Sequence, residues 1–587
     1  MFNPPEQMQY WQVVEDIVRS KGRELQRYIF FEKVWEAIDR DINLIVIRAP
    51  TNSGKTEAAS APFLRDLKLG KRRWLSLIHV LPTRSLVNSM RRRYAEAVGA
   101  LKIKNAVISY EYGQLIGVRS YLDGDIVVTT YDTMLHRFYG TDLNAPHIIG
   151  QVSKIVNSLV VMDEVQLLQD EYWYAMSLLP HHIAALLKCG VQIILMTATL
   201  PTVVLEIIKK KTSENLQNTI SEELISSPDK PVRGKISLEL RNDEIPSSQD
   251  QLVQLIREHY PGKGSVLIIT NTVEKAVSIY SSLFKAYFEN TIDLKPLLLH
   301  SRLRQGVRRD IEEFLGSEEN KKFILVATQV VEAGLDIDST LLLTEISPVD
   351  SLIQRIGRCG RRQDSIAIVY TRSEGALKVY PKSLVERTRS TIDEDPDLLA
   401  ESPGDLKAAQ ILLDKVFDSE IINLLMRYTE RSHKVIEWID KYWISSFDIG
   451  SWAAHVPPDH ILRLGIELPS YKPSLSEYGL LLREEKLEIK VEDLEKNLVR
   501  LTVRGTDEPA MPALLHEVNG NYYYICIELI TEENHHIRLV PTRTPAGKIS
   551  KIFSEIVKGK VLLLNPEFYE ITSFGSELGV VKPWKKA

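Results

Sequence analysis

The chain has 587 residues, of which 44% are hydrophobic and 26% charged, and its formal net charge is -5. This composition is typical of a soluble globular protein, and no apolar run approaches the roughly 20 residues that a membrane-spanning helix needs. The three cysteines lack zinc-ligand spacing and residues 1–10 do not resemble a signal peptide, so we expect a cytoplasmic protein without a membrane partner.

The first part of the chain alternates short apolar runs with stretches that favour helices. The runs are INLIVIRAP, WLSLIHVLPTR, GDIVVTTYD, SLVVMDE and VQIILMTATLP. Runs this short and continuously apolar are typical of strands buried on both faces of a parallel sheet. We therefore predict an α/β domain over residues 1–225.

The same α/β pattern then begins again. After the loose connection SSPDKPVRGK come the runs GSVLIITNT, LKPLLLHSR, KFILVATQ and TLLLTEISP, which predict a second α/β domain over residues 226–375. Residues 376–470 favour helices and predict a linker. Alternating stretches such as LEIKV and YYYICIELI predict a small strand-containing domain over residues 471–587.

Residues 49–56 have the features of a loop that binds phosphate. The loop follows a predicted strand, opens a predicted helix, and consists of Ala49, Pro50, Thr51, Asn52, Ser53, Gly54, Lys55 and Thr56. Its backbone N–H groups can bind phosphate oxygens, Lys55 can pair with the β and γ oxygens, and the Thr56 hydroxyl can bind magnesium. Ala49 replaces the first glycine of the usual pattern. The loop predicts that ATP and Mg²⁺ are cofactors; the alternative is an ordinary strand–turn–helix junction.

Two adjacent carboxylates end a later strand of the first domain. Asp163 can hold magnesium directly or through water, and Glu164 can orient and deprotonate the attacking water. The next strand ends in Thr197-Ala198-Thr199, which can link the phosphate site to a nucleic-acid site or simply cap a helix.

The second domain carries residues that can complete the site. Arg358 and Arg361 are three residues apart on one helix face, and we predict that both are arginine fingers. Gln354 is expected to contact the γ-phosphate or the water, and Gly334 and Asp336 to line the nucleotide cleft. A basic surface helix is the alternative. Because the two halves lie in separate domains, the site would be complete only when the domains close.

The order of these motifs resembles that of superfamily 2 helicases. The series covers residues 49–362 and includes APTNSGKT, PTRSLVNSM, TTYDTML, MDEVQ, MTATLP, TNTVEKA, LLLHSR, ATQVVEAGLDID and QRIGRCGRR. Within the superfamily, GKTEAA, DEVQLL and SLIQRIGRCGRR are similar to the CRISPR-associated helicase of type I interference systems. Members of that family often have DEVH where this chain has Gln166, and the stretch QRYIFFEKV has no glutamine at the place where an adenine-reading glutamine is expected.

The resemblance implies two tandem RecA-like domains and ATP-dependent translocation on single-stranded DNA or an RNA–DNA hybrid, with 3′-to-5′ polarity. The expected partner is a guide-RNA surveillance complex. Many relatives begin with a His-Asp nuclease, but the phosphate loop here comes too early to leave room for one. We read the pairs His181-His182 and His535-His536 as structural or surface residues, so we expect a separate His-Asp nuclease subunit.

The resemblance also implies a track of contacts with the sugar-phosphate backbone. Its residues are Thr83, Arg84, Thr129, Thr130, Asn271, Ser301, Arg302 and Thr328. Hydroxyl and arginine side chains suit this task without reading bases, and the cluster Arg91–Arg93 is expected to flank the track. Two other hypotheses stay open: an RNA helicase or DNA-repair translocase on the same core, and a non-catalytic subunit that closes on ATP without turnover.

Overall fold

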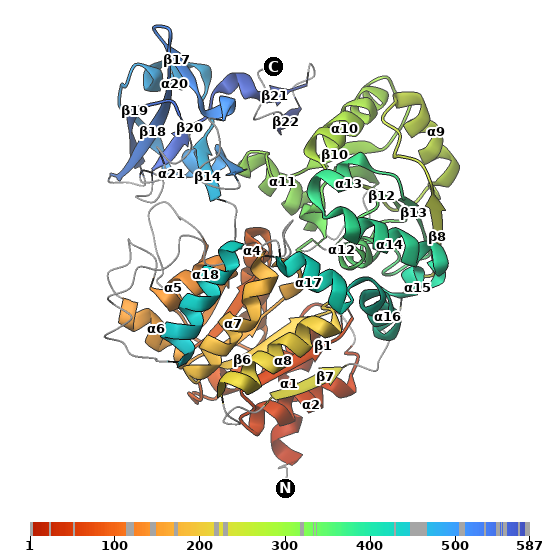
Figure 1. Ribbon diagram of the computed structural model, residues 1–587, viewed down its shortest axis with the longest axis vertical. Coiled ribbons are helices and arrows are strands. Elements are labelled where there is room, and N and C mark those ends of the chain that lie inside the picture. Colours follow the sequence, from red (N-terminus) through yellow and green to blue (C-terminus); the bar gives the residue numbers. More distant parts are fainter. Residues whose placement is uncertain are drawn as a thin grey trace.

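Figure 1 shows the computed structural model of the chain, with one α/β domain at the bottom, a second at upper right and a strand-rich domain at upper left. We call these domain 1, domain 2 and the C-terminal domain. The structure describes residues 4–22, 25–50, 53–112, 122–140, 148–168, 174–216, 222–226, 233–316, 322–332, 334–335, 337–427, 430–445, 466–503, 511–532, 536–547, 552, 555, 560–572 and 576–581. Within these residues, no helix is both long and apolar enough to cross a membrane.

Domain 1 is built on a seven-stranded parallel sheet in the order β3-β4-β2-β5-β6-β1-β7. Its strands are β1 (Leu44–Arg48), β2 (Leu77–Leu81), β3 (Ile108–Glu111), β4 (Ile126–Thr130), β5 (Leu159–Met162), β6 (Gln192–Thr197) and β7 (Glu222–Ser226). Its helices are α1 (Pro4–Ser20), α2 (Ile29–Asp39), α3 (Lys55–Lys68), α4 (Arg84–Ala100), α5 (Tyr131–Tyr139), α6 (Ile148–Val156), α7 (Tyr174–Lys188) and α8 (Thr202–Leu216), with a 3₁₀ turn η1 (Val165–Leu168).

Strand β1 shows why the apolar runs of domain 1 are continuous. Successive side chains of a strand point to opposite faces of the sheet. Leu44 and Val46 join the core that includes α5, α7 and α8, whereas Ile45 and Ile47 join the core of α1–α4. Both faces are therefore covered, as the sequence predicted for a parallel sheet.

Domain 2 repeats this architecture with a six-stranded parallel sheet in the order β10-β11-β9-β12-β13-β8. Its strands are β8 (Ile236–Arg241), β9 (Val266–Ile269), β10 (Lys295–Leu299), β11 (Phe323–Ala327), β12 (Leu341–Glu345) and β13 (Ser365–Tyr370). The other elements are α9 (Gln249–His259), α10 (Val273–Phe288), α11 (Gln305–Gly316), η2 (Gln329–Val331) and α12 (Val349–Ile356). Two tandem parallel-sheet domains confirm the predicted fold class.

The helices after domain 2 lead the chain back to domain 1. They are α13 (Glu374–Val379), α14 (Lys382–Glu394), α15 (Pro396–Glu401), α16 (Leu406–Val416), α17 (Ser419–Arg427) and α18 (Glu430–Ile439), followed by the π-helical turn η3 (Asp440–Ser445). Helix α15 packs on β8 of domain 2, and α18 packs on α7 of domain 1 (Figure 1). The carboxylate of Asp440 holds η3 against domain 1, since it lies 2.9 Å from His181 Nδ1 on α7 and 2.7 Å from Lys211 Nζ on α8.

The C-terminal domain is strand-rich, as its alternating stretches predicted. The main sheet has the order β15-β19-β18-β20-β14-β16, and β17 pairs with β18. The elements are β14 (Ile466–Tyr471), α20 (Leu475–Leu482), β15 (Leu487–Lys490), α21 (Val491–Lys496), β16 (Leu498–Val503), η4 (Pro512–Leu514), β17 (His516–Val518), β18 (Asn521–Thr531), β19 (His536–Pro545), β20 (Val561–Leu563) and η5 (Pro566–Phe568). A separate hairpin of β21 (Tyr569–Ile571) and β22 (Glu577–Val580) ends the described chain.

Candidate nucleotide and nucleic-acid sites

The predicted phosphate loop lies between β1 and α3, at the carboxyl edge of the domain 1 sheet. Gly54 has a φ of 82°, and a Cβ atom built there would lie 2.7 Å from the ring of Phe31, so only glycine fits. Ala49 has no positive φ, and its N–H donates to the carbonyl of Thr197 on β6 at 3.3 Å. The missing first glycine is therefore compatible with the loop. Thr51 and Asn52 lie outside the described residues.

Lys55 is buried and faces the carboxylates of Asp163 and Glu164. Its ammonium donates to the carbonyl oxygens of Ala49 at 2.9 Å and Pro50 at 3.0 Å. Burial lowers the pKa of Lys55, while the negative charges of Glu164 and Asp163 act in the opposite direction. The lysine and the carboxylates therefore share one low-dielectric site.

The two carboxylates follow β5 and occupy different environments. Asp163 Oδ1 accepts a hydrogen bond from the N–H of Glu164 at 2.9 Å, and its Oδ2 lies 3.4 Å from His79 Nε2. Glu164 has a φ of 50°, a left-handed conformation that is uncommon outside glycine and frequent at active sites. Burial, and then the charge of Asp163, raises the pKa of Glu164. A raised pKa suits a carboxylate that accepts a proton from water.

Asp163 and Thr56 are the residues that would hold a magnesium ion. Both are buried, and the two adjacent carboxylates leave negative charge that a divalent cation would balance. In the part of the chain that the structure describes, no group of three or more His, Cys, Asp and Glu side chains could hold a metal. The pair Thr56 and Asp163 fits magnesium, which often takes one or two protein oxygens and completes its coordination shell with phosphate oxygens and water.

A chain of hydrogen bonds leads from Glu164 to the loop after β6. Gln166 Nε2 donates to Glu164 Oε2, and Gln166 Oε1 accepts from the hydroxyl of Thr197 at 2.8 Å. The sequence had identified Gln166 only as a departure from a family pattern. The structure shows that it connects the predicted water-activating carboxylate to the Thr197–Thr199 loop, which supports the linking role of that loop over simple capping.

The same loop contacts domain 2. Gln354, on α12, donates from Nε2 to the hydroxyl of Thr199 at 3.2 Å. Gln354 is 4% exposed, and its Oε1 accepts no hydrogen bond from the described residues. A buried acceptor at the domain boundary is suited to accept a hydrogen bond from a water molecule. The predicted role of Gln354 stays a prediction, but the structure places it at the required boundary.

Arg358 and Arg361, which follow helix α12, occupy different positions. Arg358 donates to the carbonyl of Leu335 at 2.6 Å and to that of Glu332, and its positive charge acts to lower the pKa of Glu164 across the boundary. Arg361 is half-buried and donates from Nε to the carbonyl of Gly357 at 2.9 Å. Arg358 therefore faces the nucleotide site more directly than Arg361 in this arrangement.

Arg355, which the sequence analysis did not single out, is fully buried in domain 2. Its guanidinium pairs with Glu332 at 2.8 Å and donates to Asn271 Oδ1 at 2.9 Å and to the hydroxyl of Tyr380 at 3.1 Å. It also donates to the carbonyl of Glu345 at 3.0 Å. Arg355 thus connects several motif segments of domain 2. In the sequence, its spacing of three residues from Arg358 could have indicated that Arg355 also has a role in this motif.

Gly334 lies at the contact between the domains. Its φ is 86°, and a Cβ atom built there would lie 3.1 Å from Cγ of Leu86 on α4. The residue therefore allows close approach of domain 2 to the beginning of α4. Its predicted place in the nucleotide cleft stays a prediction, and Asp336 lies outside the described residues.

The predicted nucleic-acid residues of domain 1 lie at the carboxyl ends of adjacent strands. Thr83 is exposed and caps α4, while Thr130 caps α5. Thr129 is buried and donates to the carbonyl of Glu111 at 2.7 Å. The guanidinium of Arg84 lies 5.6 Å from the centre of the Tyr112 ring. Because β2 and β4 are neighbours, these residues share one edge of the sheet.

The arginines expected to flank this track divide into two groups. Arg91 is exposed, with its guanidinium 4.5 Å from the ring centre of Tyr110. Arg93 instead pairs with Glu57 of α3, where Nη2 lies 2.6 Å from Oε1. Arg93 therefore supports the helix that begins at the phosphate loop.

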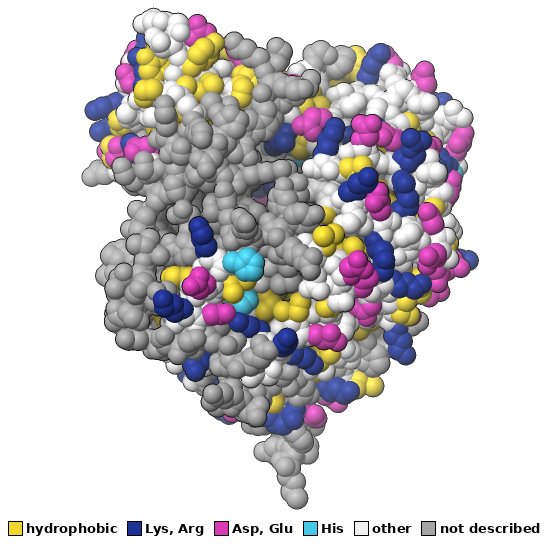
Figure 2. Space-filling model, viewed as in Figure 1, with side chains coloured by type: hydrophobic (Ala, Val, Ile, Leu, Met, Phe, Trp, Pro, Cys, Tyr) yellow, Lys and Arg dark blue, Asp and Glu magenta, His cyan; other side chains and the backbone are white. Residues whose placement is uncertain are grey.

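The predicted nucleic-acid residues of domain 2 differ in accessibility. Ser301 is exposed, whereas Thr328 and Asn271 are each 3% exposed. Asn271 donates from Nδ2 to the carbonyl of Ile346 at 2.9 Å, and Arg302 donates to Glu274 at 3.0 Å. Over domain 2, on the face in Figure 2, basic and acidic side chains are interspersed. The nucleic-acid role of these residues stays a prediction.

Comparisons with known proteins agree with the motif order and the fold. The DEAD/DEAH box helicase family matches residues 32–207, and the C-terminal family of the CRISPR-associated nuclease/helicase Cas3 matches residues 262–364. The chain is 25% identical to the CRISPR-associated helicase Cas3 of Thermoproteus tenax over 507 residues, which cover 84% of this chain and 82% of the relative.

Longer relatives are matched over a smaller share of their length. The chain is 26% identical to the CRISPR-associated nuclease/helicase Cas3 of Methanothermobacter thermautotrophicus, over 68% of this chain and 49% of that protein. The crystal structure of T. fusca Cas3 with AMPPNP has the same fold, with a TM-score of 0.59 at 17% identity over 83% of this chain and 65% of the other. Together, these findings show that the chain is an ATP-dependent helicase that is similar to the CRISPR-associated Cas3 helicases over most of its length.

Proposed function

We propose that the chain is an ATP-driven translocase on single-stranded DNA, moving 3′ to 5′ in type I CRISPR interference. The observation that carries this proposal is the hydrogen bond from Gln354 to Thr199, which joins domain 2 to the loop connected to Glu164. ATP turnover at Glu164 would thereby be coupled to the relative positions of the two domains. Such coupling is what a motor that advances along a strand needs.

The chemistry proposed for the site uses groups from both domains. The ammonium of Lys55 turns from the loop carbonyls to the β and γ oxygens of ATP, and Glu164 accepts a proton from the attacking water. The water oxygen bonds to the γ-phosphorus while the bond from this phosphorus to the bridging oxygen breaks, giving ADP and phosphate. Arg358, with Arg361 beside it, balances charge on the transferred group. A bound Mg²⁺, held by Thr56 and Asp163, would neutralise the phosphate charge.

We further propose that a separate His-Asp nuclease subunit cuts the DNA and that a guide-RNA surveillance complex recruits the motor. The relative from T. tenax, which is matched over 82% of its length, is named a helicase, whereas that from M. thermautotrophicus, matched over 49%, is named a nuclease/helicase. The test is incubation of labelled single-stranded DNA with the purified chain and Mg²⁺, Mn²⁺ or Ni²⁺. Intact DNA is expected, and cleavage that survives repurification would contradict the separate nuclease.

The substrate and polarity are tested by ATP turnover and strand displacement. We expect single-stranded DNA to stimulate ATP hydrolysis, and Lys55→Ala and Glu164→Gln to abolish it. A duplex with a 3′ single-stranded tail should be unwound, and its counterpart with a 5′ tail should not. Stimulation by RNA alone would favour the RNA-helicase hypothesis. Nucleotide binding without any hydrolysis would favour the non-catalytic subunit.

A further inference from the structure

The residues that follow β10 are held by the end of the chain. His300 is fully buried, and its Nε2 donates to the carbonyl of Leu578 at 2.9 Å. The N–H of Val580 donates to the carbonyl of Arg302 at 3.2 Å, and Arg302 Nη1 donates to the carbonyl of Val581 at 2.8 Å. We call residues 300–304 the docking segment, and β21 with β22 the C-terminal hairpin. About 270 residues of chain separate these two pieces, so their contact is tertiary.

The side chain of His300 gives the docking segment a defined shape. While its Nε2 donates to Leu578, its Nδ1 accepts from the N–H of Arg302 at 3.1 Å, which requires the neutral ring. Burial lowers the pKa of His300 to about 4, so the neutral ring is the form present near neutral pH. The hairpin therefore fixes both the ring and the backbone turn around Ser301.

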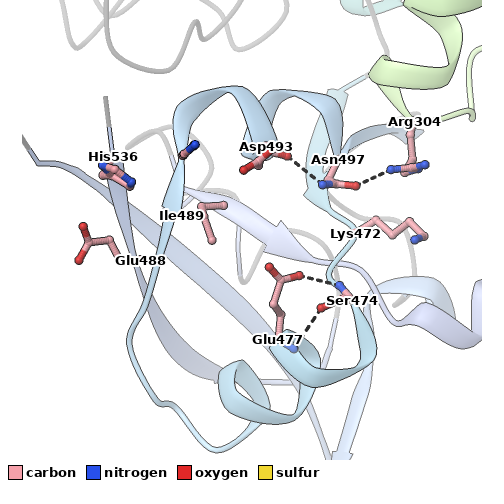
Figure 3. Close-up of a pocket in the computed structure, with 10 residues that line it drawn as sticks. Arg304, Lys472, Ser474, Glu477, Glu488, Ile489, Asp493, Asn497 and His536 are labelled. Carbon is pink, nitrogen blue, oxygen red and sulfur yellow. Dashed lines mark hydrogen bonds between the residues drawn. The ribbon is translucent and has the colours of Figure 1, made fainter. Parts of the chain in front are cut away.

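Arg304 makes the second connection. Its Nε donates to Glu577 Oε2 at 2.7 Å, and its N–H donates to the hydroxyl of Tyr569 at 3.1 Å. Its Nη1 donates to Asn497 Oδ1 at 2.6 Å, as Figure 3 shows beside a cavity of about 570 Å³ that Arg304 lines together with residues of the C-terminal domain. One side chain of domain 2 thus binds both the hairpin and the main body of the C-terminal domain.

Gly579 allows the hairpin to approach the docking segment. Its φ is 78°, and a Cβ atom built there would lie 2.5 Å from the carbonyl oxygen of Arg302 and 2.9 Å from Cε1 of His300. Real Cβ atoms essentially never come this close to backbone. Any side chain at this position would therefore separate the hairpin from the segment.

We propose that the C-terminal hairpin is a positioning element for nucleic-acid binding, because it holds the docking segment in the shape that presents Ser301 to the backbone of a bound single strand. The proposal rests on the proposed function of the chain. Ser301 is exposed between two residues that the hairpin holds. Without the hairpin, the segment would have to be ordered when the strand binds, and that ordering would weaken binding.

The test compares Gly579→Ala with a matched glycine substitution. Gly520 lies in the turn before β18 with a φ of 77°, and a Cβ atom there would meet nothing within 4 Å. Gly520→Ala therefore carries the same backbone strain without the contact. We expect Gly579→Ala to bind a labelled oligo(dT) strand about tenfold more weakly in fluorescence anisotropy, a change that equals about 1.4 kcal/mol. Its ATP turnover without DNA should equal that of wild type, and Gly520→Ala should match wild type in both.

Hydrogen exchange separates a positioning role from a merely structural one. Gly579→Ala should accelerate exchange at the amide of Arg304, which donates to Tyr569 of the hairpin, and at the amide of Arg302, which donates to the His300 ring that the hairpin holds. Faster exchange with unchanged oligo(dT) affinity would overturn the proposal. If Gly579→Ala does not fold, Glu577→Gln provides the same comparison without added atoms, since it removes the ion pair with Arg304. Wild-type protein that binds no DNA would instead refute the proposed function itself.

Discussion

Replacement of Gln166 by leucine tests whether ATP turnover requires the two hydrogen bonds by which Gln166 connects Glu164 to Thr197. Gln166 is 1% exposed, and it bridges a carboxylate and a hydroxyl. A hydrogen bond to a charged group contributes about 1.5–3 kcal/mol. If that energy orients Glu164 toward water, its loss corresponds to a fall in kcat of about 10- to 150-fold.

The pH dependence of Gln166→Leu gives an independent measurement. The hydrogen bond from Gln166 acts to lower the pKa of Glu164, so its removal raises that pKa further. Since Glu164 must be ionised to accept a proton, the acid limb of the kcat profile should move to higher pH. The assay is DNA-stimulated phosphate release between pH 5 and about 9, the range over which a raised carboxyl pKa would be visible.

A second glutamine of domain 1 provides the control. Gln192 accepts from Trp74 Nε1 at 3.0 Å and donates to the carbonyl of Ile42 at 2.9 Å, so Gln192→Leu also breaks two hydrogen bonds. It touches neither catalytic carboxylate, and its kcat and pH profile should equal those of wild type. A wild-type kcat in Gln166→Leu, or an equal loss of activity in Gln192→Leu, would refute a catalytic role for the Gln166 hydrogen bonds.

Two further predictions concern stability. Arg355→Met should destabilise domain 2 by about 3–5 kcal/mol in urea unfolding, because it leaves the buried carboxylate of Glu332 without its ion pair; an unchanged midpoint would contradict this. Burial acts to raise the pKa of Asp440, but hydrogen bonds from His181 and Lys211 outweigh it and leave the pKa below its usual value. The stability that Asp440 contributes is therefore complete above its unfolded pKa and is lost as pH falls through the lowered one. The melting temperature of Asp440→Asn should lie below that of wild type at pH 7 and approach it in acid, whereas a constant difference would contradict the ion-pair role.

Much of the fold was predictable because local patterns follow from burial. Continuous apolar runs require a sheet covered on both faces, and β1 has that environment. The phosphate loop was predictable too, because a strand, a glycine with positive φ and a lysine at a helix start form one local unit. Ala49 could replace glycine since its backbone needs no positive φ.

Contacts between distant segments could not be predicted in the same way. Gln166 has no distinguishing sequence context, and its role depends on Thr197, 31 residues later. Arg355 looks like its neighbour Arg358, yet one is enclosed within domain 2 and the other faces the boundary. The contact of His300 with the last described strand joins residues 278 positions apart. No local pattern specifies such pairs, because they depend on how whole domains pack.

We propose that one nucleotide site is divided between the two α/β domains. Arg358 donates to the carbonyls of Leu335 and Glu332, both in domain 2, so we expect Arg358→Ala to leave the phosphate loop of domain 1 intact. The most direct measurement is ATP hydrolysis by Arg358→Ala at saturating single-stranded DNA, beside its binding of a fluorescent ATP analogue. We predict that turnover falls by about 10³-fold or more while the analogue still binds. Turnover at the wild-type rate would contradict a site completed by domain 2.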